Sequence, residues 1–407
     1  MNLSYFIASR YFKSKAKKNF ITVLSRISMV GVAVGTIALV VVLSVFNGLE
    51  DLIKGLYASF DADLKVMPFK GKSFEIDDEF LAKIAKLEGV EILTEVIEDN
   101  ALVKYGDHQV VATLKGVSDN FIAQDRFKDG YLSGEMSLGE KNRPQALIGR
   151  GLSYFLLLNL DNEFDLIQVF YPKDPKSGSI DPTSMYNREV IQPAGIFSVE
   201  KQIDDEFLIV PLDFASKLLD YGNRRTGLEI MVEDGHNVQR VKAELRTLLG
   251  ENFIVQDSDE QHASLLMTIR LEKLFVFLTL TFILAVASFN IFFSLSMLAI
   301  EKKKDIAVLL AMGGTKKLIR SIYLKEGAII AFSGALVGLV LGFLICWIQD
   351  TYGLVSLGVT SSVIDAYPVK MQWTDFLYTS LSVVIITMIA SYRPALIASR
   401  VKTTLHL

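Results

Sequence analysis

The sequence has little of the chemistry that most enzyme and metal sites need. Its 407 residues include a single cysteine, Cys346, so no disulfide can form within the chain. None of its four histidines stands at metal-ligand spacing to a cysteine or to another histidine. It also lacks a Gly-x-x-x-x-Gly-Lys-Ser/Thr loop, a Gly-x-Ser-x-Gly elbow and a His-Glu-x-x-His pair. We therefore expect no catalytic residues, no metal, no cofactor bound by this chain and no nucleic-acid partner.

Charge is missing from four long stretches of the chain. The composition is 51% hydrophobic, with a mean hydropathy of +0.35, although 22% of the residues are charged. A bilayer core of about 30 Å needs roughly 20 consecutive apolar residues in a helix. The sequence therefore predicts a membrane α-helical protein with four transmembrane helices, the fourth being the shortest. The uncharged stretches are residues 27–49, 274–300, 327–348 and 376–392.

Acidic residues are scarce in three segments, and this predicts the orientation. Residues 1–26, 301–326 and 393–407 together hold 16 of the 42 basic residues but only 3 of the 46 acidic ones. By the positive-inside rule these segments are cytoplasmic, and residues 50–273 and 349–375 lie on the opposite side of the membrane. The first apolar run shows no signal-peptide cleavage pattern, so we interpret it as an uncleaved signal anchor. The protein is thus expected to be a multi-pass membrane protein with both termini in the cytoplasm.

The large outer segment, residues 50–273, predicts an α+β domain. Two strand–helix–strand units flank it, and together they favour a split β-α-β platform. Between them, about residues 100–226 form an inserted β-rich lobe that we expect on top of the platform. Its first hairpin turns at Gly106-Asp107. The flanking elements are strand 63–69, helix 77–87 and strand 91–97, then strand 228–232, helix 238–249 and strand 253–256.

Two patterns predict how the membrane part packs. Leu3, Phe6, Ile7 and Tyr11 recur at helical spacing among basic residues, which suits an amphipathic helix in the cytoplasmic headgroup layer. The alternative is a basic flank that only sets the topology. Glycines at positions 334, 338 and 342 form a ridge that lets helices approach closely. We expect this ridge to pack within one subunit, the alternative being a dimer interface.

The cytoplasmic loop carries a short helix pattern over residues 301–315. Apolar Ile306, Leu309, Leu310 and Met312 lie between charged ends, and Gly313-Gly314 ends the pattern. A short loop has no core of its own in which to bury these side chains. They therefore predict a protein partner in the cytoplasm, the alternative being a helix on the lipid surface.

Several blocks of the sequence resemble a known family. The blocks that carry the resemblance are Arg270–Leu274 (RLEKL), Ala285–Ile291 (AVASFNI), Glu301-Lys302 with Asp305–Leu309 and Gly313, Ile27-Ser28 with Leu43–Glu50 (LSVFNGLE), Phe207–Leu212 with Phe214-Ala215, and Pro394-Ala395 with Ala398–Arg400. They are similar to the second span, the coupling helix and other parts of FtsX/MacB-type ABC transporter permeases, and more narrowly of the lipoprotein-releasing (LolC/LolE-type) subfamily.

The resemblance implies a multi-pass protein of the bacterial inner membrane whose large domain, residues 50–273, lies in the periplasm. It also implies a function and a set of partners. Such a permease is non-catalytic and pairs with a second permease subunit and with separate ATPases (LolD type) that bind ATP and Mg. The complex pulls lipoproteins from the outer leaflet of the inner membrane and passes them to a periplasmic carrier (LolA type). Coupling to the ATPase is expected through Lys304, Asp305, Ile306, Leu309, Leu310, Gly313 and Gly314. The substrate cavity is expected to be lined by Val42, Val45, Phe46, Leu278, Phe282 and Ala285. The alternative is that these six side chains have no role in transport and face lipid.

A proline-bearing segment between two strand-like flanks, 165–170 and 189–197, is where such permeases carry a carrier-gripping hairpin. The residues expected to bind the carrier are Tyr171, Pro172, Pro175, Pro182 and Tyr186, although this segment matches the family only loosely. A surface loop without a partner remains the alternative. For the whole chain, the alternatives are an FtsX-type regulator of cell-wall hydrolases, which has a smaller outer domain, and a non-transporting membrane sensor or scaffold.

Overall fold

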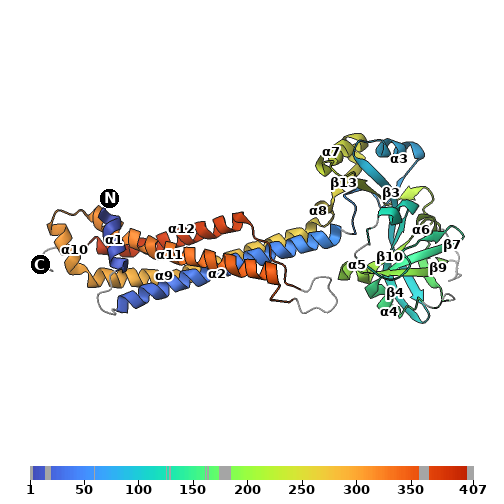
Figure 1. Ribbon diagram of the computed structural model, residues 1–407. Helices are drawn as coiled ribbons and strands as arrows, with labels where there is room; N and C mark the ends of the chain where they lie inside the picture. Colours follow the sequence, from blue (N-terminus) through green and yellow to red (C-terminus); the bar gives the residue numbers. More distant parts are fainter. Residues whose placement is uncertain are drawn as a thin grey trace. The chain divides into compact units, whose positions relative to one another are not determined.

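The computed structural model of the protein contains two compact units, Met1–Leu52 with Leu265–Leu407, and Ile53–Ser264 (Figure 1). We refer to them as the helical unit and the α/β unit. The residues that the structure describes are 3–13, 20–58, 60–124, 126–127, 130–160, 162, 165–173, 185–356 and 366–400.

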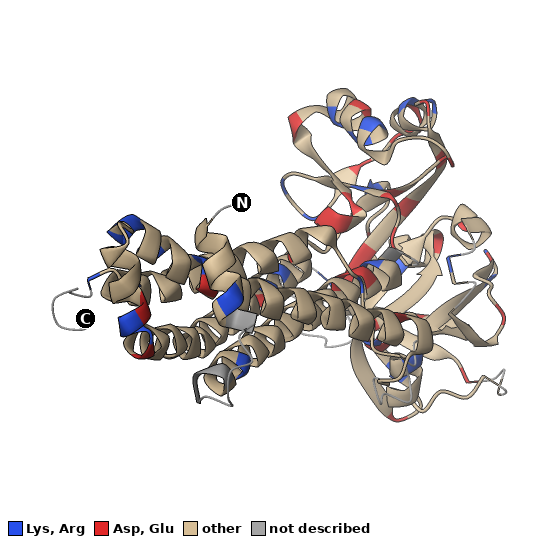
Figure 2. Cartoon of the chain, turned by 60° about the vertical axis from the view of Figure 1, so that its left-hand side comes forward, with Lys and Arg blue, Asp and Glu red and all other residues tan. Residues whose placement is uncertain are grey.

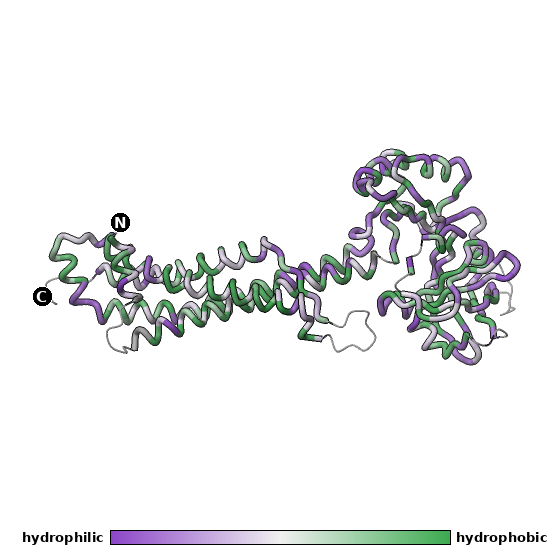
Figure 3. Tube along the Cα trace, in the orientation of Figure 1, coloured by the Kyte–Doolittle hydropathy of each residue, from purple (hydrophilic) through white to green (hydrophobic). Residues whose placement is uncertain are grey.

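The helical unit is built from four long helices, each long and apolar enough to cross a membrane, as the sequence predicts. Figure 3 shows their apolar character along most of their length, and Figure 2 shows that their charged residues gather toward the ends. A core of aliphatic side chains from all four helices holds the bundle together. The helices of this unit are α1 (Leu3–Lys13), α2 (Phe20–Ala58), α9 (Ala263–Glu301), α10 (Lys303–Ala311), α11 (Lys316–Tyr352) and α12 (Trp373–Ala398).

The glycine ridge of α11 packs against α2. A Cβ atom added to Gly338 would lie 2.6 Å from the Cβ of Thr36, and one added to Gly342 would lie 3.0 Å from the Cβ of Val40. No side chain larger than glycine's fits at Gly338 without moving one of the two helices. The prediction that this ridge packs within one subunit is therefore confirmed.

The α/β unit contains one large mixed sheet with helices on its faces. Its strands follow the order β13-β1-β12-β3-β4-β10-β7-β9-β5, with β6 paired to β7, and β8 paired to β3 and β9. The elements are β1 (Leu64–Pro68), β2 (Phe74–Glu75), α3 (Asp78–Ala85), β3 (Val90–Tyr105), β4 (His108–Val117), β5 (Tyr131–Gly134), β6 (Gly139–Glu140), β7 (Arg143–Gly149), α4 (Arg150–Phe155), β8 (Ile167–Pro172), β9 (Tyr186–Phe197), α5 (Lys201–Glu206), β10 (Phe207–Pro211), α6 (Leu212–Leu219), β11 (Arg224–Arg225), β12 (Gly227–Val232), α7 (Val238–Leu249), β13 (Phe253–Asp257) and α8 (Ser258–Gln261).

The two predicted strand–helix–strand units interleave in this sheet. Strand β12 lies antiparallel between β1 and β3, and β1 lies antiparallel between β12 and β13. Helices α3 and α7 lie close together beside these strands (Figure 1), and their buried faces share one apolar core with them. That core includes Leu64, Val66, Ile84, Leu228, Ile230, Val241, Leu245 and Val255.

The inserted lobe departs from the prediction at β3. The sequence predicts a platform strand at 91–97 and a separate hairpin strand at 101–105, whereas the structure has one strand over Val90–Tyr105. Neither glycine nor proline interrupts this stretch, and both of its edges are paired. Strand β12 pairs with it up to Val96, and β4 pairs with it from Val96 to Tyr105. The platform and the inserted lobe therefore share a single sheet.

A buried ionic cluster connects four strands of the sheet. The Glu229 carboxylate accepts from Lys115 and from Arg126, each at 2.6 Å, and Lys65 donates to Glu98 at 2.9 Å. Lys115 also lies 3.5 Å from Glu98. Burial raises the pKa of the Glu229 carboxyl, but the three nearby cations outweigh this effect and hold its pKa at about 2. The carboxylate thus stays ionised inside the sheet.

Candidate coupling and transport surfaces

One end of the helical unit, which carries α1 and α10, has an apolar core of its own that we call the basal core. Five helices contribute to it, so the ends of α9, α11 and α12 are joined there to α1 and α10. Figure 1 shows these elements gathered at the same end. Its buried residues are Ala8, Leu298, Ala299, Ile306, Ile319, Ile322, Tyr323, Ala395 and Ala398.

The structure divides the predicted coupling residues between two sides of α10. Ile306 is 1% exposed in the basal core, and Leu309 and Leu310 are half-buried. Lys304 and Asp305 are exposed. The Ile306 side chain therefore anchors α10 and is not available to a docking partner. The prediction treated the apolar residues of this helix as one exposed face, because only tertiary contacts separate its two sides.

The exposed side of α10 continues into a glycine turn. Val308 is 47% exposed and Met312 is 79% exposed. Gly313 has a φ of +91°, which favours glycine, and the Gly314 amide donates to the Leu309 carbonyl at 2.9 Å. The sharp turn that ends α10 keeps Met312 at the surface.

Helix α1 packs on α11 through small residues that are not among the predicted functional residues. Ala8 is fully buried and Ser4 is 4% exposed. The Lys325 ammonium donates to the Ser4 hydroxyl at 2.6 Å, and Ser321 lies within 3.3 Å of the same oxygen. The signal available in the sequence was the four-residue spacing of Ser4 and Ala8, which resembles that of the glycine ridge. Helix α1 is thus part of the packed bundle.

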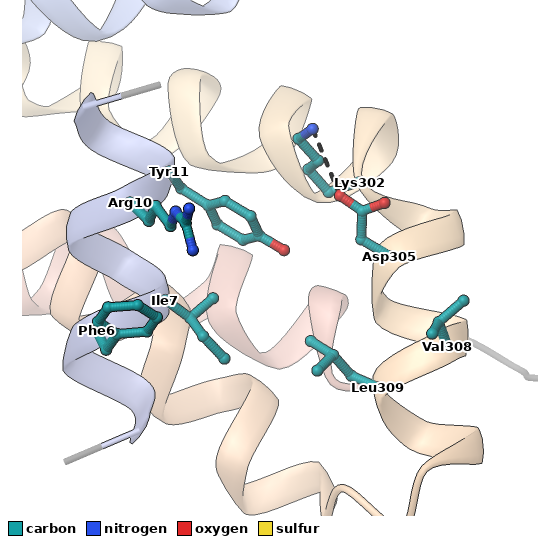
Figure 4. Close-up of a pocket in the computed structure, with 8 residues that line it drawn as sticks. All are labelled: Phe6, Ile7, Arg10, Tyr11, Lys302, Asp305, Val308 and Leu309. Atoms are coloured by element: carbon teal, nitrogen blue, oxygen red, sulfur yellow. Dashed lines mark ion pairs between the residues drawn. The ribbon is translucent and has the colours of Figure 1, made fainter. Parts of the chain in front are cut away.

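A pocket of about 680 Å³ separates α1 from α10. Figure 4 shows that side chains from the two helices face the same space. Lys302 and Asp305 pair at 3.4 Å on one wall. Burial, with the Asp305 and Glu326 carboxylates nearby, raises the pKa of Tyr11 to about 12, so its hydroxyl stays protonated. The pocket is lined by Phe6, Ile7, Arg10, Tyr11, Lys302, Asp305, Val308 and Leu309.

The predicted cavity residues differ in their exposure. On α9, Leu278 is 53% exposed and Phe282 is 69% exposed, whereas Ala285 is half-buried. On α2, residues 42, 45 and 46 (Val42, Val45 and Phe46) are half-buried. In the most apolar 18-residue stretch of each span, only 17% of the residues of α9 are buried, against 33–39% in the other three spans. Helix α9 therefore presents the least covered apolar surface of the bundle.

A polar cluster joins α2, α9 and α12 at the end of the bundle away from α10. Asn47 donates to Asp375 at 2.7 Å and to the Lys370 carbonyl at 3.1 Å. Lys273 donates to the Asn47 side-chain oxygen at 2.6 Å and lies 3.2 Å from Asp375. No sequence pattern predicts this cluster. The only signal was one asparagine near the end of an uncharged run.

The predicted carrier-binding segment starts and ends on a paired hairpin. Strands β8 and β9 are antiparallel, with Tyr171 opposite Asn187 and Pro172 opposite Tyr186. The Tyr171 hydroxyl donates to Asp99 at 2.9 Å, which ties the end of β8 to β3. Pro175 and Pro182 lie outside the described residues.

The chain matches two known protein families. The MacB-like periplasmic core domain matches residues 25–248, more than half of the chain, and the FtsX-like permease C-terminal family matches residues 277–403. The chain belongs to the FtsX/MacB-type ABC transporter permeases. The MacB-like match therefore covers the first span and most of the α/β unit of this permease, and the FtsX-like match covers the last three spans and α10.

The permease is also similar to individual proteins over nearly its full length. It is 24% identical to the lipoprotein-releasing system transmembrane protein LolC of Xylella fastidiosa, over 98% of this chain and 97% of that one. It is 22% identical to LolE of Haemophilus influenzae, over 99% and 98%. The periplasmic region of MacB from Actinobacillus actinomycetemcomitans aligns with a TM-score of 0.36 and 11% identity, covering 50% of this chain and 91% of that one.

Proposed function

We propose that this permease is the membrane subunit of an ABC transporter that releases lipoproteins from the outer leaflet of the inner membrane. The observation that carries the proposal is the similarity to LolC and LolE over 98–99% of the chain, which spans both units. The interleaved order of β13, β1, β12 and β3 supports a split β-α-β platform in the outer domain.

The energy source in this proposal is an ATPase on a separate chain, and the docking surface is the exposed side of α10. Lys304, Val308, Ala311 and Met312 lie on that side. The buried Ile306 ties α10 to the ends of α9, α11 and α12. A push on α10 is thereby passed to three spans through packed side chains.

The substrate path in this proposal runs along the uncovered side of α9. Its exposed Leu278 and Phe282 offer apolar surface to the acyl chains of a lipoprotein, or to a second permease subunit that closes the cavity. The hairpin of β8 and β9 is proposed to hold the periplasmic carrier, because its ends are fixed to the sheet while proline resists pairing beyond them.

The test is lipoprotein release in reconstituted vesicles. The full chain, purified together with the ATPase that accompanies it, is placed in proteoliposomes with a triacylated lipoprotein, and a soluble carrier is added outside. We expect ATP-dependent transfer of the acylated protein to the carrier and none of a control lacking the acylated cysteine. Absence of transfer, with a change in cell-wall hydrolase activity instead, would favour the regulator alternative.

A further inference from the structure

The pocket between α1 and α10 combines cations with an apolar wall. Phe6 and Ile7 of α1 face Val308 and Leu309 of α10 across it (Figure 4). The volume of about 680 Å³ is in the range of pockets that hold small-molecule ligands. Among its lining residues, only Val308 also lies on the side of α10 that is proposed to dock the ATPase.

The charge inside the pocket favours an anion. Arg10 lies 5.7 Å from the Phe6 ring, and among the described residues no carboxylate lies within ion-pair distance of its guanidinium. Lys302 pairs with Asp305, so the residues that line the pocket carry one net positive charge, that of Arg10. Tyr11 stays protonated and can donate a hydrogen bond. A single phosphate diester would complete this arrangement.

The apolar surface continues from the pocket along α1. Leu3 is 56% exposed and Tyr5 is 57% exposed, so the helix offers apolar side chains beside the pocket as well as within it. The neighbouring sequence carries Lys13, Lys15, Lys17 and Lys18, a basic run of the kind that anionic lipids attract at a cytoplasmic membrane surface. An acidic segment of a protein partner would satisfy Arg10 but would leave this extended apolar surface uncovered.

We propose that the pocket between α1 and α10 binds an anionic phospholipid of the cytoplasmic leaflet, with the phosphate at Arg10 and Tyr11 and an acyl chain along Phe6 and Ile7. The proposal does not depend on the transported substrate. Because the same lipid would touch Val308 and Leu309, its binding would steady α10 against α1.

The experiment measures lipid retention by the full-length chain. The protein is purified in detergent, exchanged into nanodiscs with equal parts of phosphatidylglycerol and phosphatidylcholine, and then analysed by native mass spectrometry for bound lipid. Wild type should retain phosphatidylglycerol, and Arg10→Gln should retain about fivefold less, as expected for the loss of one interfacial cation. The matched control Arg26→Gln removes an exposed cytoplasmic guanidinium outside the pocket and should behave as wild type.

Further arms separate the possible outcomes. Arg10→Lys should restore most of the retention, and unchanged melting temperatures would exclude misfolding. Glycerol phosphate in excess should not displace the lipid, because it lacks acyl chains. Displacement would show that the pocket binds anions without specificity for lipid, and would overturn the proposal. Equal retention by wild type and Arg10→Gln would overturn the proposal. If Arg10→Gln instead lost only the associated ATPase, the pocket would be a protein contact.

Discussion

Glu229 shows how a single buried carboxylate can depend on its neighbours. Its side chain is 3% exposed, and it is held by Lys115 and Arg126 from other parts of the α/β unit. Sequence patterns could not predict this contact, because Glu229, Lys115 and Arg126 are distant in the chain and each is a residue type usually found at the surface.

Replacing this carboxylate should reveal both a stability loss and a pH dependence. Glu229→Gln leaves Arg126 without its carboxylate partner and leaves Lys115 only the 3.5 Å contact with Glu98, so it should cost about 3–5 kcal/mol at neutral pH. Because the folded pKa is about 2, against an ordinary value of 4.5, the contribution is complete above pH 4.5 and falls as the pH drops toward 2. The melting temperatures of wild type and variant, measured on the full chain in detergent, should therefore converge below pH 4.5.

The control for this variant is Glu244→Gln on α7, where the carboxylate is 36% exposed and pairs with Arg240. Its melting temperature should stay close to that of wild type at every pH. A difference between wild type and Glu229→Gln that stays constant down to pH 3 would contradict the role assigned to its charge.

Phe282 tests the proposed substrate path with a close match on another helix. Phe282 on α9 and Phe332 on α11 are 69% and 68% exposed, so changing either to serine removes the same apolar surface. Phe282→Ser should lower lipoprotein release severalfold, while Phe332→Ser should leave it near the wild-type rate. Equal losses in the two variants, measured in the vesicle assay, would speak against α9 as the path.

At the scale of single elements, α10 shows what the sequence could and could not predict. The helix, its end at Gly313-Gly314 and the nearby spans followed from charge and hydropathy, which are local properties. The division of its side chains into a buried and an exposed side could not be predicted, because Ile306 is buried only by contacts with helices far away in the chain. The packing of α1 through Ser4 and Ala8 was missed for the same reason.

The two sides of α10 should respond differently to a new charge. Met312→Glu places the charge on an exposed residue and should weaken ATPase co-purification while the permease stays folded. Ile306→Glu places it in the basal core, where an unpaired charge costs several kcal/mol, and should reduce the yield of folded permease itself. Co-purification and size-exclusion profiles distinguish the two effects, and full ATPase binding by Met312→Glu would refute the docking surface.

The hairpin of β8 and β9 can be shortened without disturbing its base. Replacing residues 173–185 with a short Gly/Ser turn keeps the paired ends at Pro172 and Tyr186. We expect ATP hydrolysis to persist while cross-linking of the periplasmic carrier to this chain disappears. A variant of unchanged length in which Pro175 and Pro182 are changed to serine tests separately whether the prolines themselves are needed. Carrier cross-linking that survives the deletion would rule out this role.

At the scale of the whole molecule, the distribution of charge and the two units predict one orientation. The spans, the basic segments and the similarity to permeases along the full chain all agree with an inner-membrane protein that has a periplasmic domain. The structure also helps to choose labelling positions. Gly130 is unsuitable for cysteine, because a Cβ atom there would lie 2.4 Å from the Ser198 carbonyl oxygen.

Asp234 and Lys316 are better labelling positions, since both are exposed. In a Cys346→Ala background, Asp234→Cys should react with a membrane-impermeant maleimide on spheroplasts. Lys316→Cys should react only after the membrane is opened. The reverse pattern would overturn the orientation.

The basal core also has a consequence for how the permease is made. It joins Ala8 of α1 and Ile306 of α10 to Ala395 and Ala398 of α12. At about 5–20 residues per second, a ribosome needs roughly tens of seconds to proceed from α1 to α12. During that time α1 and α10 have no complete binding site. A chain that stops before α12 lacks Ala395 and Ala398, so the part of the basal core that they cover stays exposed until synthesis is complete.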